Sequence, residues 1–154
     1  MKPTVLIIDV DGVMTTGQVL YSADGKEYKI FGAHDSDGLK LLHGKIKISF
    51  ITADKRGYPI SKKRIVDDMG FPLHVVPEAD RLAYFEQLDI GSTIFIGDGY
   101  HDAPVLRRCG FGIAPVSARR EARAAADFVT ASAAGHGAVL DACLEVQKRF
   151  FSDA

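Results

Sequence analysis

The stretch Val5-Leu6-Ile7-Ile8-Asp9-Val10-Asp11-Gly12 decides the expected fold. It begins with four consecutive apolar residues, a run that is typical of a strand covered on both faces. Asp9 and Asp11 follow and are expected at the carboxyl end of that strand, where open α/β sheets bind ligands. A divalent cation is the usual partner of adjacent carboxylates, and an ionised carboxylate can attack phosphorus. A turn that uses Gly12 for its bend explains the same residues. A catalytic or metal site is therefore favoured only if further polar residues later in the chain reach the same place.

Length and composition are those of an ordinary globular chain. The 154 residues carry a formal net charge of -1, with 47% hydrophobic and 25% charged residues. This length predicts one domain, 1–154. The composition has no basic excess, and so does not indicate a nucleic-acid partner. The sequence has neither the pattern of a signal peptide nor an apolar run long enough for a membrane span. Cys109 and Cys143 lack metal-ligand spacing and are expected to be buried thiols of a cytoplasmic protein.

A β-hairpin is expected after Gly12. Residues 18–21 and 26–31 flank Ala23-Asp24-Gly25, and an Asp-Gly pair between two such stretches is a strong hairpin signal. The ribbon carries apolar and aromatic residues and is not stable alone. It must therefore pack on its own sheet or on another subunit.

The remainder of the chain alternates between strand and helix patterns. Strands are expected at 45–51, 73–76, 93–96, 111–114 and 128–129, and helices at 35–43, 59–70, 79–88, 103–108, 117–126 and 137–150. This alternation indicates a doubly wound, Rossmann-like α/β fold, in which helices cover both faces of a parallel sheet.

Three expected strand ends bring polar groups to one edge of this sheet. Asp9 and Asp11 follow the first strand, Thr52 follows strand 45–51, and Asp98 and Asp102 follow strand 93–96. Carboxyl ends of parallel strands lie on the same side, so these carboxylates can share a cation beside groups that hold phosphate oxygens. Alone, Thr52 is better explained as a strand-end residue and Asp98 as part of a turn. Together they favour chemistry.

In this order the motifs resemble those of the haloacid dehalogenase superfamily of phosphohydrolases. The matching stretches are Asp9-Val10-Asp11-Gly12-Val13, Ile51-Thr52-Ala53, Arg81 and Gly97-Asp98-Gly99-Tyr100-His101-Asp102. The hairpin, the stretch 31–42 and the closing Gly135-His136-Gly137-Ala138-Val139 narrow the resemblance to a capless, tetrameric branch of sugar-acid phosphatases. The intervals between the motifs leave no room for a separate cap domain.

The resemblance implies a Mg²⁺-dependent phosphomonoesterase acting in the biosynthesis of lipopolysaccharide or capsule. The substrate would be a phosphorylated sugar acid of the 3-deoxy-octulosonate 8-phosphate or nonulosonate 9-phosphate type. Asp9 would be the nucleophile and Asp11 the acid and base. Mg²⁺ would be held by Asp9, the backbone carbonyl of Asp11 and Asp98, with Asp102 bound to the ion or next to its ligands. Thr52 and Arg81 would bind the phosphoryl oxygens, and the active unit would be a homotetramer.

Departures from the family pattern leave alternatives open. The third motif of the family is usually a Lys, and this chain has Arg81 at that place. Lys55, Lys62 or Lys63 is therefore an alternative residue for the positive charge of that motif. Arg keeps the charge but adds a bidentate fork. The candidate substrate-binding residues are Thr52, Ala53, Asp54, His34 and Arg64. Two rival functions are a phosphatase of another small sugar phosphate and a catalytically silent scaffold, and the intact carboxylates argue against the scaffold.

Overall fold

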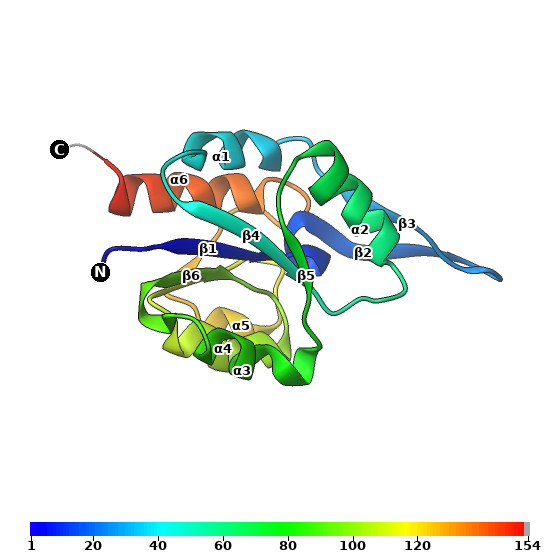
Figure 1. The fold of residues 1–154 in the computed structure, drawn as a ribbon. Coiled ribbons are helices and arrows are strands. Elements are labelled where there is room, and N and C mark those ends of the chain that lie inside the picture. The colour runs from blue at the N-terminus through cyan, green and yellow to red at the C-terminus, as the bar shows by residue number, and fades with distance from the viewer. Residues whose placement is uncertain (153–154) are drawn as a thin grey trace.

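The computed structural model describes residues 1–152, which form a six-stranded parallel sheet between two layers of helices (Figure 1). The strand order is β5-β4-β1-β6-β7-β8, and every neighbouring pair is parallel. The strands are β1 (Val5–Asp9), β4 (Lys47–Thr52), β5 (Leu73–Val75), β6 (Thr93–Ile96), β7 (Phe111–Ala114) and β8 (Phe128–Val129). The predicted doubly wound α/β fold is confirmed.

Helices cover both faces of the sheet (Figure 1). One face carries α1 (Asp35–Leu42) and α6 (Ala138–Phe150), and the other carries α3 (Arg81–Glu86), α4 (Ala103–Arg108) and α5 (Arg120–Ala125). α2 (Tyr58–Lys62) continues into a wider helical turn, η2 (Lys63–Asp68). Three short 3₁₀ turns, η3 (Glu78–Asp80), η4 (Ile90–Ser92) and η5 (Tyr100–Asp102), precede α3, β6 and α4. None of the helices within residues 1–152 has the length and apolar character that a membrane crossing requires.

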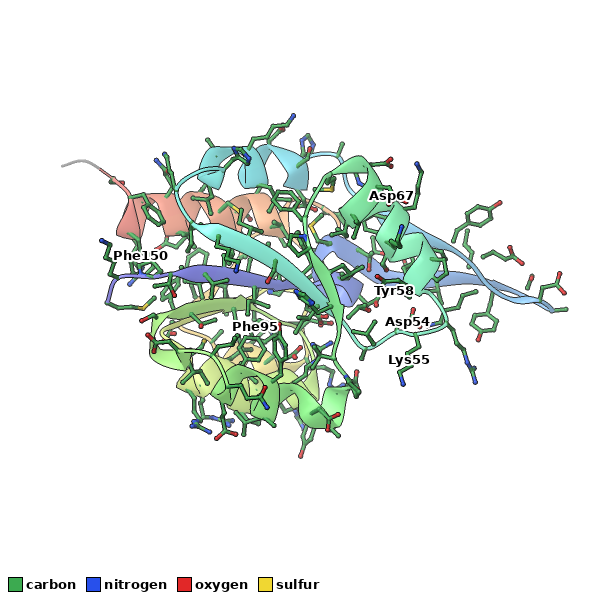
Figure 2. All side chains as sticks on the ribbon, viewed as in Figure 1. Asp54, Lys55, Tyr58, Asp67, Phe95 and Phe150 are labelled. Atoms are coloured by element: carbon green, nitrogen blue, oxygen red, sulfur yellow. The ribbon has the colours of Figure 1, made fainter. Side chains whose placement is uncertain are left out.

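β1 contributes side chains to the apolar clusters on both faces of the sheet. Leu6 and Ile8 belong to the cluster under α1 and α6, and Ile7 belongs to the cluster on the opposite face. None of the three side chains is more than 1% exposed. Phe95 of β6 lies in the layer between the sheet and α3–α5, whereas Phe150 lies at the end of the molecule opposite Asp54 (Figure 2). Packing on both faces and pairing on both edges therefore hold the carboxyl end of β1 in place.

A separate antiparallel hairpin of β2 (Thr15–Ser22) and β3 (Gly25–Phe31) projects from the sheet (Figure 1). The predicted hairpin is confirmed, and pairing of Thr15 with Phe31 makes it longer than expected. A kinked turn, η1 (Val10–Met14), joins it to β1. Within residues 1–152 the segments between the elements form no cap domain.

Element ends differ from expectation where the backbone makes extra turns. The strand expected from residue 45 begins at Lys47, because the N–H groups of Lys45 and Ile46 both donate to Leu42 O. The helix expected from residue 117 begins at Arg120, because Ala118 N first closes a turn onto Pro115 O at 3.0 Å. The helix expected at 79–88 begins with the 3₁₀ turn η3 and becomes α-helical at Arg81.

Asp35 ties the start of α1 to the start of α6. Its buried carboxylate Oδ1 accepts hydrogen bonds from Val139 N at 3.1 Å and Leu140 N at 3.3 Å. The residue before α6 is Gly137, which has no side chain to accept these N–H groups. Asp35 therefore caps a helix that begins about a hundred residues later in the chain.

Replacement of Asp35 by Ala should lower the free energy of unfolding by about 1–3 kcal/mol, because it leaves two helix N–H groups without an acceptor. Asp35→Asn should cost less, since the amide oxygen still accepts. Asp37→Ala is the matched control, because Asp37 is an exposed residue in the same helical turn. Urea unfolding followed by circular dichroism measures all three, and equal stability of Asp35→Ala and the control would contradict the capping role.

Candidate active site

Asp9 lies at the carboxyl end of β1, between the ends of β4 and β6. Its residue exposure is 4%, and its Oδ1 accepts hydrogen bonds from Val10 N at 3.0 Å and Arg81 Nη2 at 3.1 Å. The second carboxylate oxygen, Oδ2, is not used in these bonds. Asp9 is therefore held at one oxygen and retains the other for chemistry.

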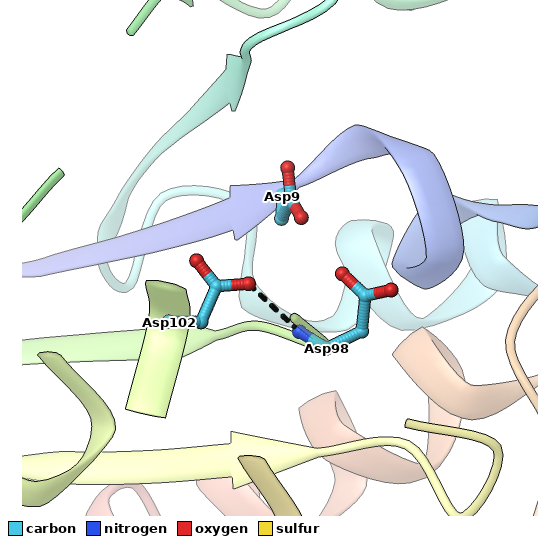
Figure 3. A group of neighbouring side chains, drawn as sticks. All are labelled: Asp9, Asp98 and Asp102. Carbon is cyan, nitrogen blue, oxygen red and sulfur yellow. Dashed lines mark hydrogen bonds between the residues drawn. The ribbon is translucent and has the colours of Figure 1, made fainter. Parts of the chain in front are cut away.

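Asp98 and Asp102 reach the same point from the loop after β6. Asp102 Oδ2 accepts hydrogen bonds from Asp98 N at 3.0 Å and Gly99 N at 2.9 Å, which closes the loop around its carboxylate (Figure 3). One carboxylate oxygen from each of Asp9, Asp98 and Asp102 lies within 4.8 Å of the others. Figure 3 shows the carboxylates of Asp98 and Asp102 below Asp9, on the side where β6 follows β1 in the sheet.

Arg81 bridges two members of this carboxylate group. It is the first residue of α3, and only 3% of the residue is exposed. Nη1 donates to Asp102 Oδ1 at 2.7 Å, and Nη2 donates to Asp9 Oδ1 at 3.1 Å. Burial alone would lower the pKa of Arg81, but the two carboxylates outweigh burial and raise it. The planar guanidinium thus fixes Asp9 and Asp102 relative to each other.

Arg81 does not balance all of the negative charge of Asp9, Asp98 and Asp102. Burial raises the pKa of Asp9 well above the usual carboxyl range; Arg81 opposes the shift, and Asp102 and Asp98 add to it. Burial likewise raises the pKa of Asp98 to about 6, with a further contribution from Asp102. Three carboxylates around one guanidinium therefore fit a divalent cation, which would supply the missing charge through the oxygen ligands it prefers.

Gly12 makes room for Asp98. Its φ of +81° is a left-handed conformation that other residues adopt only with strain. A Cβ at this position would overlap the Asp98 carboxylate. The glycine after the second Asp of the motif is therefore required by close packing as well as by the bend of the chain.

The side chain of Asp11 is held by residues outside the group of Asp9, Asp98 and Asp102. Its Oδ1 lies 2.8 Å from Lys29 Nζ, and its Oδ2 accepts a hydrogen bond from Thr52 Oγ1 at 3.2 Å. Thr52 ends β4 and is fully buried. The structure thus brings Asp11 and Thr52 together beside Asp9, while the Asp11 side chain is absent from the group that could hold a metal. The backbone carbonyl of Asp11 stays the predicted ligand.

A cavity of about 630 Å³ opens over these residues. Ala53 and Asp54 line it on the β4 side. The other lining residues are Asp9, Asp11, Gly12, Gly17, Val19, Lys26, Pro77, Glu78, Arg81, Asp98, Gly99, His101 and Asp102. Burial alone would raise the pKa of Asp54, but hydrogen bonds from Lys26, Gly57 N and Lys29 lower it to about 2. The same cavity is therefore lined by the carboxylates of Asp9, Asp98 and Asp102 and by an Asp54 carboxyl whose pKa lies below the usual range.

Three predicted substrate-binding residues do not line this cavity, and one of them is Thr52, which is fully buried beside Asp11. His34 is exposed before α1, and Arg64 lines a different cavity with residues of α1. The alternative third-motif cations are also elsewhere. Lys62 and Lys63 form exposed ion pairs with Asp67 and Asp68, and Lys55 is absent from the lining of the cavity. Arg81 alone among these cations contacts Asp9.

Sequence reasoning missed Lys26 and Lys29 of the hairpin. Lys26 lines the cavity and pairs with Asp54 Oδ1 at 2.7 Å, and Lys29 pairs with both Asp11 and Asp54. The signal is the alternation in β3, where Lys29 stands between Tyr28 and Ile30. With both neighbours turned outward, the lysine must point inward.

Comparison with known proteins assigns the class. The sequence profile of haloacid dehalogenase-like hydrolases matches residues 79–142. The chain is 31% identical over 149 residues to 3-deoxy-D-manno-octulosonate 8-phosphate phosphatase KdsC of Salmonella typhi, covering 90% of this chain and 76% of that protein. KdsC of Haemophilus influenzae is 32% identical over 140 residues, which cover 86% and 76% of the two chains. The chain belongs to the haloacid dehalogenase-like hydrolases.

Comparison with solved structures shows which members of that class have a similar fold. The cobalt-bound form of the H. influenzae deoxy-D-mannose-octulosonate 8-phosphate phosphatase has a TM-score of 0.82 and 28% identity, covering 96% of this chain and 88% of that one. The same phosphatase from Moraxella catarrhalis, in complex with magnesium ion, phosphate ion and KDO, has a TM-score of 0.81 and 25% identity, with 96% and 87% covered. In sequence and in structure, the protein is thus similar to 3-deoxy-D-manno-octulosonate 8-phosphate phosphatase.

Replacement of Gly12 by Ala should weaken binding of a divalent cation by about tenfold or more, because the new Cβ displaces Asp98. Gly44→Ala is the matched control: its φ of +80° is nearly the same, but a Cβ there meets nothing within 4 Å. Isothermal titration with Mg²⁺ measures both variants. Equal affinities would show that the close approach of Gly12 to Asp98 does not shape a cation site.

Proposed function

We propose that this chain is a Mg²⁺-dependent phosphomonoesterase that hydrolyses a sugar-acid phosphate of the 3-deoxy-octulosonate 8-phosphate type through an aspartyl-phosphate intermediate. The observation that carries the proposal is the grouping of Asp9, Asp98 and Asp102 at the carboxyl edge of the sheet. The named relatives support this substrate class, and one of them holds magnesium, phosphate and the sugar acid together.

Asp9 acts as the nucleophile. An oxygen of its carboxylate attacks phosphorus as the bond from phosphorus to the sugar oxygen breaks, and Asp11 donates a proton to that oxygen. Asp11 then takes a proton from water, which attacks the phosphorus of the aspartyl phosphate and releases phosphate. The water proton replaces the one given to the sugar, so Asp9 and Asp11 return to their starting states.

The surrounding groups bind and orient the phosphoryl group. Asp9, the backbone carbonyl of Asp11, Asp98 and Asp102 would hold Mg²⁺, which when bound offsets the negative charge on the transferring group. Thr52 and Arg81 would bind the phosphoryl oxygens, and Arg81 also holds Asp9 and Asp102 in place. Ala53 and Asp54 contact the sugar acid, since both line the cavity.

Phosphate release from 3-deoxy-D-manno-octulosonate 8-phosphate tests the proposal. The rate should require Mg²⁺, vanish with chelator and return when Mg²⁺ is restored. Asp9→Asn should reduce turnover to background, because loss of the attacking group in a hydrolase costs on the order of 10⁶-fold. Asp37→Asn, a change of an exposed carboxylate, is the control and should retain the rate. A folded wild-type chain that hydrolyses only another sugar phosphate would refute the substrate, and one that is inactive on every phosphomonoester would favour a scaffold.

We propose in addition that the active unit is a homotetramer of one domain per chain, spanning residues 1–154, in the cytoplasm. The hairpin supports the assembly, because it exposes Leu20, Tyr21, Tyr28 and Ile30 by 42–65%. A two-stranded ribbon with an apolar outer face needs a partner. His34 and Arg64 would then serve a site shared between subunits. The unpaired, buried Cys109 and Cys143 suit a reducing compartment.

Light scattering coupled to size exclusion tests the assembly. The wild-type chain should elute at four times its 16.7 kDa mass. The pair Tyr21→Ser and Tyr28→Ser should shift it toward the monomer, whereas Leu144→Ser, an exposed change on α6, should leave it a tetramer. A monomeric wild-type chain with full specific activity at assay dilution would refute the assembly.

A further inference from the structure

The hairpin turns one charged side chain inward. In β3, Tyr28 and Ile30 are exposed by 65% and 42%, whereas the side chain of Lys29 between them is fully buried. A lysine ammonium is almost never buried unless it is paired. The position of Lys29 therefore depends on the groups that surround its nitrogen.

Three oxygens from three separate parts of the chain surround Lys29 Nζ. Asp11 Oδ1 lies at 2.8 Å and Asp54 Oδ2 at 3.0 Å, and Nζ donates a hydrogen bond to Ser61 Oγ at 2.8 Å. An ammonium has three N–H donors, which is the number of oxygens present. Lys29 is also absent from the residues that line the cavity. Its head group is thus engaged within the protein and has no donor left for a substrate.

The packing around Lys29 is tight as well as polar. A Cβ added at Gly57 would lie 2.8 Å from Lys29 Cε and would overlap the Asp54 carboxylate. The start of α2 therefore closes over the lysine stem, and the ammonium cannot move without moving Asp54. Lys26 differs from Lys29: it reaches Asp54 from the cavity side, and 23% of its side chain is exposed.

Asp11 depends on this contact for its orientation. Its Oδ1 is held by Lys29 and its Oδ2 by Thr52. Within residues 1–152, Lys29 is the sole cation that forms an ion pair with Asp11. Removal of the ammonium would leave the carboxylate anchored only by a 3.2 Å hydrogen bond from Thr52, with its side chain 34% exposed.

We propose that Lys29 is a positioning residue for the reaction: by holding Oδ1, it keeps the Asp11 side chain directed at the departing sugar oxygen, so that the carboxyl is in place when it carries the proton. The inference rests on the proposed phosphatase function. Lys29 itself gains and loses no proton in the reaction. Because Lys29 belongs to β3, the proton-transfer step becomes dependent on the docking of the hairpin against η1 and α2.

Leaving-group dependence separates positioning of Asp11 from a general structural effect. An alkyl phosphate such as the sugar-acid phosphate needs a proton on its leaving oxygen, whereas p-nitrophenyl phosphate leaves as a stable phenolate and needs none. Loss of acid catalysis is worth about 10²–10⁴-fold where a proton is needed. Lys29→Met, which keeps the apolar stem, should thus lower kcat/KM on the sugar-acid phosphate by about tenfold or more beyond any loss on p-nitrophenyl phosphate, since kcat/KM excludes the later step in which Asp11 activates water for both substrates. KM should change by less than about twofold, since Lys29 lies outside the cavity lining.

Matched variants complete the experiment. Lys45→Met removes an exposed lysine that bonds to Gln147 at 2.9 Å on another part of the surface, and it should change neither substrate. Addition of Lys29→Met to Asp11→Asn should cause no further loss of kcat, because the residue that Lys29 positions is already gone. If Lys29→Met does not fold, as judged by circular dichroism, the double variant Lys29→Met with Asp54→Asn removes the second carboxylate that faced the ammonium, and it is compared with Asp54→Asn alone, because Asp54 also pairs with Lys26 and lines the cavity.

Each result has a distinct meaning. An equal loss of kcat/KM on the two substrates, or a rise in KM without loss of kcat, would overturn the positioning role and leave the phosphatase function intact. Additive losses in the Asp11→Asn background would also overturn it. An inactive wild-type chain would instead refute the proposed function itself, before any variant is compared.

Discussion

The bridge that Arg81 forms between Asp9 and Asp102 is the interaction on which the site depends. It joins the end of β1 to the loop after β6 through the first residue of α3. Two like charges 4 Å apart repel by about 4 kcal/mol at the effective dielectric typical near a protein surface, so the carboxylates need this cation in order to converge. One guanidinium balances only part of their charge. The site can therefore accept a further cation. The carboxylates that join β1 to the loop after β6 through Arg81 are the same groups whose negative charge that cation would balance.

Much of the fold follows from local pattern. The apolar run of β1 and the regular alternation after it predict a parallel sheet, because such strands must be covered on both faces. The strands at 93–96 and 111–114 have the expected ends because turn-forming residues bound them. Element ends are less predictable where backbone groups close extra turns, as at Leu42 and Pro115. The cap that Asp35 supplies to α6 has no local signal, since donor and acceptor lie far apart in sequence.

The candidate site, like the fold, was predictable from the sequence only in part. Asp9, Asp98 and Thr52 could be placed together from sequence, because strand direction alone brings them to one edge. Arg81 lies on a helix, and only the packing of α3 against that edge shows that its guanidinium, and not Lys62 or Lys63, reaches the carboxylates. Lys29 was missed because its strand reads as a ribbon with apolar residues on one face. The pattern shows the alternation, but it does not show which face meets the sheet.

The sheet order has a consequence for how the protein is made. β1 is central, yet its two neighbours, β4 and β6, are synthesised long after it. An emerging chain must therefore carry an unpaired apolar strand until Lys47–Thr52 leaves the ribosome, and it has no complete catalytic edge until Asp102 has followed. Such non-local pairing slows folding and leaves strand edges open to wrong partners. The early hairpin, whose strands are adjacent in sequence, is the part that can form first, ahead of the sheet onto which it docks.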